Sequence, residues 1–111
     1  MDQNLKTKWI TALRSGDYKQ GTCSLKNPNG RFCALGVLCD LDPRVEWIVR
    51  FGQPYAQFEG NADPYKLPEA YRHEIGLDEG PMQDITDLND GSNSLPKRSF
   101  ERIADWIEDY L

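Results

Sequence analysis

Three cysteines and a single histidine are the side chains of this sequence best suited to binding a metal or attacking a substrate. A structural zinc site takes four ligands, usually in pairs about two to four residues apart. Cys23, Cys33, Cys39 and His73 do not form such pairs. A catalytic cysteine needs a base such as His73 beside it, and nothing in the sequence brings the two together. We therefore expect free structural thiols in a reducing compartment and no cofactor, with a small cysteine- or metal-dependent hydrolase as an alternative.

A second candidate for chemistry is a segment that interleaves basic and aromatic side chains. It contains Tyr18, Lys19, Lys26, Arg31 and Phe32. Cationic side chains bind phosphate groups, and an aromatic ring can stack on a base. The segment therefore predicts a small nucleotide ligand as one alternative function.

Aromatic side chains also punctuate residues 53–66, which we expect to form an irregular loop. They are Tyr55, Phe58 and Tyr65. A long loop carrying aromatic rings in a small domain is often a binding loop. The other interpretation is a lid in which the rings lie on the core.

Acidic residues gather in the second half of the chain. Residues 1–55 carry a net charge of +3, and residues 56–111 carry −8. The last predicted helix presents Glu101, Asp105, Glu108 and Asp109. Like charges one turn apart repel each other, and the helix dipole disfavours negative charge near a C-terminus. One interpretation is a solvated surface that keeps the protein soluble. The other, which we pursue, is that this acidic face binds a basic or nucleic-acid-binding protein. Direct DNA binding is not expected, because phosphates would be repelled.

No enzyme signature is present in the sequence. A Gly-rich phosphate loop, a nucleophile elbow and a zinc-protease motif are all missing. The run over residues 84–91 offers oxygen ligands for a calcium ion. A calcium-binding loop ends on a glutamate ligand about eleven residues after its first ligand, but counting from Asp87 that position is Arg98. We expect residues 84–90 to form an acidic turn instead.

Helices are expected to position most of these residues. Leu5, Trp9, Ile10 and Leu13 form one stripe of a helix over about residues 5–15, which Gly16 ends. The apolar run over residues 33–41 predicts a short buried helix at the centre of the core. Pro43 then suits the start of a helix over about residues 43–51.

The remaining elements are a hairpin and two helices. A hairpin is expected near residues 18–33, with Asn29 and Gly30 at the turn and Cys33 opposite Lys26 rather than Cys23. Pro68 begins a helix that Gly76 ends. Ser99 caps a last helix whose apolar stripe is Phe100, Ile103, Ala104, Ile107 and Leu111.

The length and composition fit one small domain over residues 1–111. Of the 111 residues 39% are hydrophobic and 28% charged, which argues against disorder. The longest apolar run is too short to span a bilayer, and the N-terminus lacks the pattern of a secretory signal, so a cytoplasmic protein is expected. The predicted fold class is α+β, mainly α: four to five helices and one β-hairpin around a buried central helix.

The chain also resembles a group of short uncharacterised proteins of phages and bacteria. The residues that carry the resemblance are Trp9, Ala12-Leu13, Ser15-Gly16, Tyr18, Gln20-Gly21, Cys33-Ala34-Leu35-Gly36-Val37-Leu38-Cys39-Asp40, Leu67-Pro68, Ile75-Gly76-Leu77, Asp87-Leu88-Asn89-Asp90, Ser99-Phe100 and Ile103-Ala104. The resemblance implies a phage or prophage setting and hence a bacterial cytoplasm. Small acidic phage proteins often bind and inhibit host factors.

These observations favour a binding protein over an enzyme. The expected function is a non-enzymatic inhibitor or modulator of a host protein, including a defence protein, which acts through the acidic face. Nucleotide binding and a cysteine- or metal-dependent hydrolase remain the alternatives.

Overall fold

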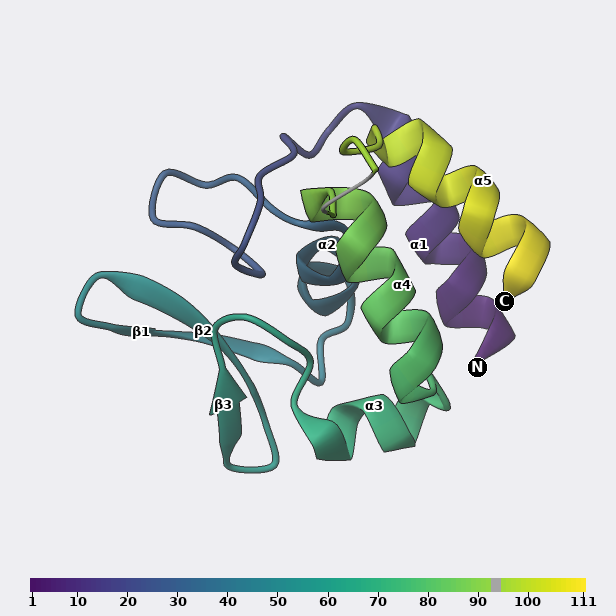
Figure 1. Cartoon of the computed structure of the whole chain (residues 1–111). Coiled ribbons are helices and arrows are strands. Elements are labelled where there is room, and N and C mark those ends of the chain that lie inside the picture. The colour runs from purple at the N-terminus through teal and green to yellow at the C-terminus, as the bar shows by residue number, and fades with distance from the viewer. Residues whose placement is uncertain (93–94) are drawn as a thin grey trace.

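The computed structural model describes residues 1–92 and 95–111, which form five helices and one three-stranded antiparallel sheet (Figure 1). In chain order the elements are α1 (Gln3–Ser15), α2 (Ala34–Leu41), β1 (Glu46–Arg50), β2 (Gln53–Phe58), β3 (Asn61–Asp63), α3 (Glu69–Ile75), α4 (Glu79–Asp90) and α5 (Phe100–Tyr110). The predicted α+β class is confirmed. In Figure 1, α1, α4 and α5 gather on one side, and the hairpin of β1 and β2 projects from the other.

Helix α1 follows the prediction closely. The carboxylate of Asp2 accepts a hydrogen bond of 3.1 Å from the Leu5 N–H and caps the first turn. The four residues of the predicted apolar stripe are buried, and Gly16 ends the helix. This stripe packs α1 against α2 and α5.

Helix α2 is the buried centre of the core, as predicted. Every side chain from Ala34 to Cys39 is buried. The indole N–H of Trp9 donates a hydrogen bond of 2.8 Å to the carbonyl of Ala34, so α1 is tied to the start of α2 by a polar contact inside the apolar core.

The sheet occupies a segment for which a helix and an irregular loop were predicted. The pairing of β1 with β2 runs from Glu46 opposite Gln57 to Arg50 opposite Gln53. The helix expected over residues 43–51 is wrong, because its β-branched and aromatic side chains pair across strands instead of forming a helical stripe. The loop expected after it is also wrong, since most of it is β2 and β3.

Two unusual turns explain why the sheet was missed. Phe51 and Gly52 connect β1 to β2 with φ angles of 53° and 77°, and Glu59 and Gly60 connect β2 to β3 with 48° and 82°. Two-residue turns with positive φ at both positions match the twist of a hairpin, and Asn-Gly is their usual sequence. Here Phe51 and Glu59 adopt the left-handed conformation, so the usual sequence signal is absent.

The hairpin predicted before α2 is present only as a tight turn with single bridging pairs. The N–H of Gly30 donates to the carbonyl of Asn27 at 3.0 Å, and Lys26 lies opposite Phe32. The predicted register placed Cys33 opposite Lys26 and is wrong by one residue. The reason is that the turn holds an odd number of residues instead of two.

The second half of the chain is more helical than predicted. Helix α3 lies between Pro68 and Gly76 as expected. The acidic turn expected over residues 84–90 is wrong, because this segment is the second half of α4, which buries Met82, Ile85 and Asn89 at helical spacing. Helix α5 begins after Ser99, whose hydroxyl accepts from the Arg102 N–H at 3.3 Å.

Candidate functional site

Several of the segments that carry the resemblance meet at one buried side chain, Asn89 of α4. Its Oδ1 accepts hydrogen bonds from the Ala34 N–H and from the Gln20 side chain, both at 3.1 Å. Its Nδ2 donates to the Gly21 carbonyl at 2.9 Å and to the Asp90 carboxylate at 2.8 Å. Asn89 therefore caps the start of α2 from α4, at an end where α2 has no cap of its own.

Two glycines of the same segments allow close backbone contacts. A Cβ at Gly36 of α2 would lie 1.7 Å from the carbonyl oxygen of Leu25, and a Cβ at Gly21 would lie 2.8 Å from the Cβ of Arg31. The loop before α2 thus passes directly over the helix. These residues, together with Asn89, explain how the core is assembled and offer no reactive group.

The structure buries two of the three cysteines. Cys33 and Cys39 are buried, Cys23 is exposed, and all three are free. Burial raises the pKa of Cys33 to about 12 and raises the pKa of Cys39 well above its ordinary value. The position of Cys33 before α2 therefore gives no activated nucleophile, because desolvation outweighs the hydrogen bonds that favour a thiolate there.

His73 lies apart from the thiols. Its side chain is 66% exposed on α3, with Nε2 3.6 Å from Glu69. Within residues 1–92 and 95–111, no three His, Cys, Asp or Glu side chains are arranged to hold a metal ion. The structure does not bring the four weak metal candidates together.

The predicted basic and aromatic segment forms a small cluster around Trp47, which the sequence analysis missed. The rings of Tyr18 and Phe32 meet edge to face at 5.0 Å, and Trp47 follows at 6.2 Å from Phe32. The Lys26 ammonium lies 5.3 Å from the Phe32 ring and 5.4 Å from the Trp47 ring. Lys19 and Arg31 are exposed outside this cluster.

The polar groups of this cluster are used within the fold. The carboxylate of Asp40 accepts from the Tyr18 hydroxyl at 2.7 Å and from the Trp47 indole N–H at 3.0 Å. Burial, followed by the bond to Asp40, raises the pKa of Tyr18 to about 12. The cluster holds β1 against the loop before α2, and its geometry favours a packing role.

The three aromatic residues of the expected loop do not act together. Phe58 is buried against Tyr71 with ring centres 5.3 Å apart. Tyr55 is half-buried, and the guanidinium of Arg50 lies 5.2 Å from its ring centre. Tyr65 is 65% exposed. Phe58 therefore matches the lid interpretation, and only Tyr65 is freely available to a partner.

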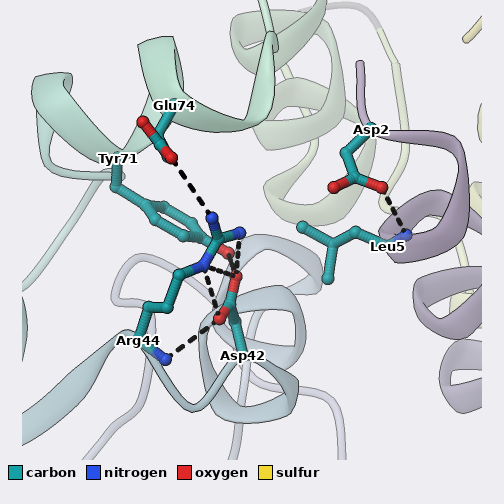
Figure 2. A network of polar contacts seen from close by, with 6 residues as sticks. All are labelled: Asp2, Leu5, Asp42, Arg44, Tyr71 and Glu74. Atoms are coloured by element: carbon teal, nitrogen blue, oxygen red, sulfur yellow. Dashed lines mark hydrogen bonds and ion pairs between the residues drawn. The ribbon is translucent and has the colours of Figure 1, made fainter.

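A second polar network lies at the end of α2 (Figure 2). The buried carboxylate of Asp42 accepts a two-pronged contact from Arg44, with the shortest distance 2.7 Å, and the Tyr71 hydroxyl donates to it at 2.9 Å. Arg44 reaches on to Glu74 of α3 at 3.5 Å. The charged and polar groups of this network bond to one another and join α2 to α3, which favours a structural role.

The predicted acidic face divides into paired and unpaired carboxylates. The guanidinium of Arg14 on α1 lies 2.8 Å from Asp105 and 3.3 Å from Glu108. These carboxylates therefore gain an interaction within the fold, contrary to the sequence argument, which could not foresee that α1 lies beside α5. Glu101 and Asp109 form no ion pair with any described residue.

Beside this face lies a groove between α4 and α5, here called the α4–α5 groove. It has a volume of about 310 Å³. Its lining residues are Asp84, Asp87, Leu88, Ser92, Leu95, Pro96 and Trp106. Trp106 is half-buried with its ring centre 5.2 Å from that of Tyr110, which is 71% exposed. Apolar surface and two carboxylates thus meet in one concave site.

Two larger hollows lack this combination. One lies beside β3 and α3 and mixes charges of both signs, including Lys66, Arg72, Glu69 and Glu79. The other follows the outer side of α1 past Ala12 and Tyr18. We take the α4–α5 groove as the candidate binding site, because it combines an apolar lining with two carboxylates in one concave surface.

No helix in the described part of the chain is both long and apolar enough to cross a membrane. Comparison with curated proteins and with solved structures gives no match. A family model described as "Domain of unknown function (DUF8296)" matches residues 1–68, from α1 through the sheet to the start of α3. Because the match covers more than half of the sequence, the chain belongs to the DUF8296 family.

Proposed function

We propose that this protein is a non-enzymatic protein-binding module whose α4–α5 groove takes a basic, amphipathic segment of a partner protein. The observation that carries the proposal is the position of Trp106 in a groove bordered by Asp84 and Asp87. An aromatic side chain supplies contact area, and the carboxylates select lysine or arginine on the partner.

The electrostatics around the groove support a basic partner. Asp84 is exposed, and the side-chain carboxylate of Asp87 accepts a hydrogen bond from Gln83 of the same helix at 3.0 Å. The C-terminal end of α4 at Asp90 adds the negative end of a helix dipole. Asp109 and Glu101 extend the negative field along α5 and would speed association with a positively charged surface.

The cellular setting of the proposal rests on the resemblance to phage and bacterial proteins. We expect a bacterial cytoplasm and a host protein as the partner, one that is basic or binds nucleic acid. Binding would inhibit or modulate that protein, as a counter-defence factor does. The nucleotide-binding and hydrolase alternatives have no comparable site among the described residues.

The proposal is tested with an amphipathic helical peptide of leucine and lysine, measured by calorimetry. The wild-type protein should bind this peptide and not the isomer in which glutamate replaces lysine. Asp84→Lys combined with Asp87→Lys should weaken binding about tenfold or more. The matched control is Asp17→Lys combined with Glu59→Lys. It changes the net charge by the same amount as the first double variant, but away from the groove. Equal binding by the two double variants would overturn the proposal.

A second readout places the peptide on the groove itself. The indole resonance of Trp106 should shift on titration, whereas that of the fully buried Trp9 should not. A thermal-shift screen with nucleotides and divalent metals addresses the alternatives, because a ligand that binds only the native state raises the melting temperature. A shift with either class, and none with the peptide, would favour that alternative.

A further inference from the structure

The outer edge of β1 is open. The strand order is β1-β2-β3, so β1 pairs on one side only. Among residues 1–92 and 95–111, no backbone hydrogen bond reaches its other side. Val49 is 67% exposed, and Phe51 at the adjoining turn is fully exposed. An open, apolar strand edge is a template for pairing with another strand.

The register with β2 shows which backbone groups face outward. Val49 lies opposite Pro54, which has no N–H, so these two residues form a non-hydrogen-bonded pair. Their neighbours Ile48 and Arg50 therefore direct their N–H and C=O groups toward β2. Trp47 and Val49 direct theirs toward the open edge.

The sequence of β1 is self-complementary about its central residue. It reads Glu46-Trp47-Ile48-Val49-Arg50, with an acid at one end and a base at the other. In an antiparallel pair of two identical strands centred on Ile48, each Glu46 faces an Arg50. Each Trp47 then faces a Val49. A two-fold axis requires this reciprocity, in which a residue and its counterpart exchange the same contact.

We propose that a second copy of this chain pairs with β1 across its open edge, centred on Ile48, and joins the two sheets into one six-stranded antiparallel sheet. Trp47 exchanges backbone hydrogen bonds with the partner's Val49, and Val49 with the partner's Trp47. Ile48 packs on Ile48 of the partner subunit at a non-hydrogen-bonded position.

The side chains on the two faces of this joint also fit. Glu46, Ile48 and Arg50 share one face of the strand, so Glu46 meets the partner's Arg50 in a non-hydrogen-bonded pair, where side chains approach closely. Neither forms an ion pair with any described residue of its own chain. On the other face Trp47 meets the partner's Val49, an aromatic and β-branched pair that stabilises sheets.

The chemistry of the edge favours a second copy over an unrelated strand. Proline, lysine and bulges often keep an edge strand unpaired, and β1 has none of these; its two charged residues, Glu46 and Arg50, stand at its ends. The proposed joint satisfies both charges at once, because each acid and each base meets its opposite. It is separate from the α4–α5 groove and does not rest on the proposed function.

The joint is tested first by sedimentation velocity of the full chain over a range of concentrations. A monomer–dimer equilibrium is expected, because five residues per strand make a small contact. In amide exchange followed by NMR, Trp47 and Val49 should become protected as concentration rises, whereas Ile48 should be protected throughout. A wild-type protein that stays monomeric, or a dimer in which these two amides stay unprotected, would overturn the proposal.

Charge reversal supplies the sharper test. Glu46→Arg alone and Arg50→Glu alone each place like charges opposite each other and should raise the dimer dissociation constant about threefold to tenfold. The double variant keeps the composition and net charge of the wild type and should restore its dissociation constant. Val49→Pro removes an outward N–H without costing a bond to β2 and should abolish the dimer.

The fold of each variant is first checked by circular dichroism and a melting curve. If Val49→Pro disturbs the hairpin, the dissociation constants of the charge variants test the proposal instead. If both single reversals dimerise as the wild type does, or if a folded Val49→Pro variant still dimerises, the interface lies elsewhere. If the wild type stays monomeric, and if its β1 edge binds an added peptide of unrelated sequence but not a peptide with the β1 sequence, the edge belongs to a foreign strand. Either result overturns the proposal.

Discussion

The hydroxyl of Tyr71 donates a hydrogen bond of 2.9 Å to the carboxylate of Asp42, a side chain of which only 4% is exposed. Asp42 follows α2, and Tyr71 lies in α3, so this bond connects the central helix to the second half of the chain (Figure 2). Arg44 neutralises the same carboxylate at 2.7 Å. A buried charge is tolerated here because all of these partners converge on it.

Removing the Tyr71 hydroxyl should therefore destabilise the fold. Tyr71→Phe leaves a buried carboxylate with one fewer donor, and a loss of about 1–2 kcal/mol is expected in urea unfolding. Tyr65→Phe changes an exposed hydroxyl and should leave the unfolding free energy within about 0.5 kcal/mol of the wild type. Equal effects at the two positions would mean that the hydroxyl of Tyr71 contributes nothing.

The same carboxylate makes stability depend on pH in a defined direction. Burial by itself raises the pKa of Asp42, but hydrogen bonds from the side chain and backbone of Arg44 and from Tyr71 outweigh it, so the pKa lies below its ordinary value. A lowered folded-state pKa stabilises the protein above about pH 4 and loses this contribution as the pH falls through the folded-state pKa.

Unfolding measured between about pH 7 and pH 2 should show this loss in the wild type. Asp42→Asn should be less stable at neutral pH and should lose less on acidification, since it lacks the titrating group. Asp17→Asn, which alters an exposed carboxylate, should keep the wild-type slope. A slope unchanged by Asp42→Asn would assign the acid sensitivity to other carboxylates.

Replacing Gly36 by alanine should destabilise the protein, whereas the same replacement at an ordinary helical position stabilises it. Alanine normally favours a helix over glycine by about 1 kcal/mol. Here its Cβ would lie 1.7 Å from the carbonyl oxygen of Leu25, and a backbone atom cannot move aside cheaply. Gly36→Ala should cost about 3 kcal/mol or more. The control is Thr11→Ala, on the exposed side of α1, which should be neutral or slightly stabilising. A Gly36→Ala protein that is more stable than the wild type would show that the loop containing Leu25 does not cover α2.

Periodicity and capping residues were sufficient to predict four of the helices. The stripes of α1 and α5, the apolar run of α2, and the flanking residues Pro68 and Gly76 of α3 are local signals. The sheet was not predictable in the same way. The apolar residues of β1 also fit a short helix, and the turn residues Phe51 and Glu59 are not those that usually mark a hairpin.

The contacts that define the candidate site are not local, which is why the sequence indicated them poorly. Arg14 reaches Asp105 from a helix at the other end of the chain. The α4–α5 groove exists because residues 84–90 continue a helix past Trp106 rather than turn. The acidic composition of the region was evident, but its apolar groove depends on how α4 and α5 pack.

Asn89 should be among the polar residues most sensitive to substitution. Asn89→Ala removes hydrogen bonds to Ala34, Gln20 and Gly21, and it leaves the Ala34 N–H and the Gly21 carbonyl without these partners. The expected loss is about 2–4 kcal/mol in chemical unfolding. Asn4→Ala, in an exposed position of α1, is the control and should change stability by less than about 0.5 kcal/mol. A loss that small for Asn89→Ala would mean that the start of α2 is held by its apolar contacts alone.

The three thiols should separate cleanly by reactivity. Cys23 is exposed, whereas burial raises the pKa of Cys33 to about 12, so that its reactive thiolate is scarce at pH 8. A disulfide reagent should therefore modify one thiol rapidly in the native protein and all three after unfolding. Cys23→Ser should remove the rapid phase, and Cys33→Ala should keep it while lowering the melting temperature. Rapid modification of Cys33 or Cys39 in the folded protein would show that the centre of the core opens on the timescale of the reaction and would reopen a chemical role for these thiols.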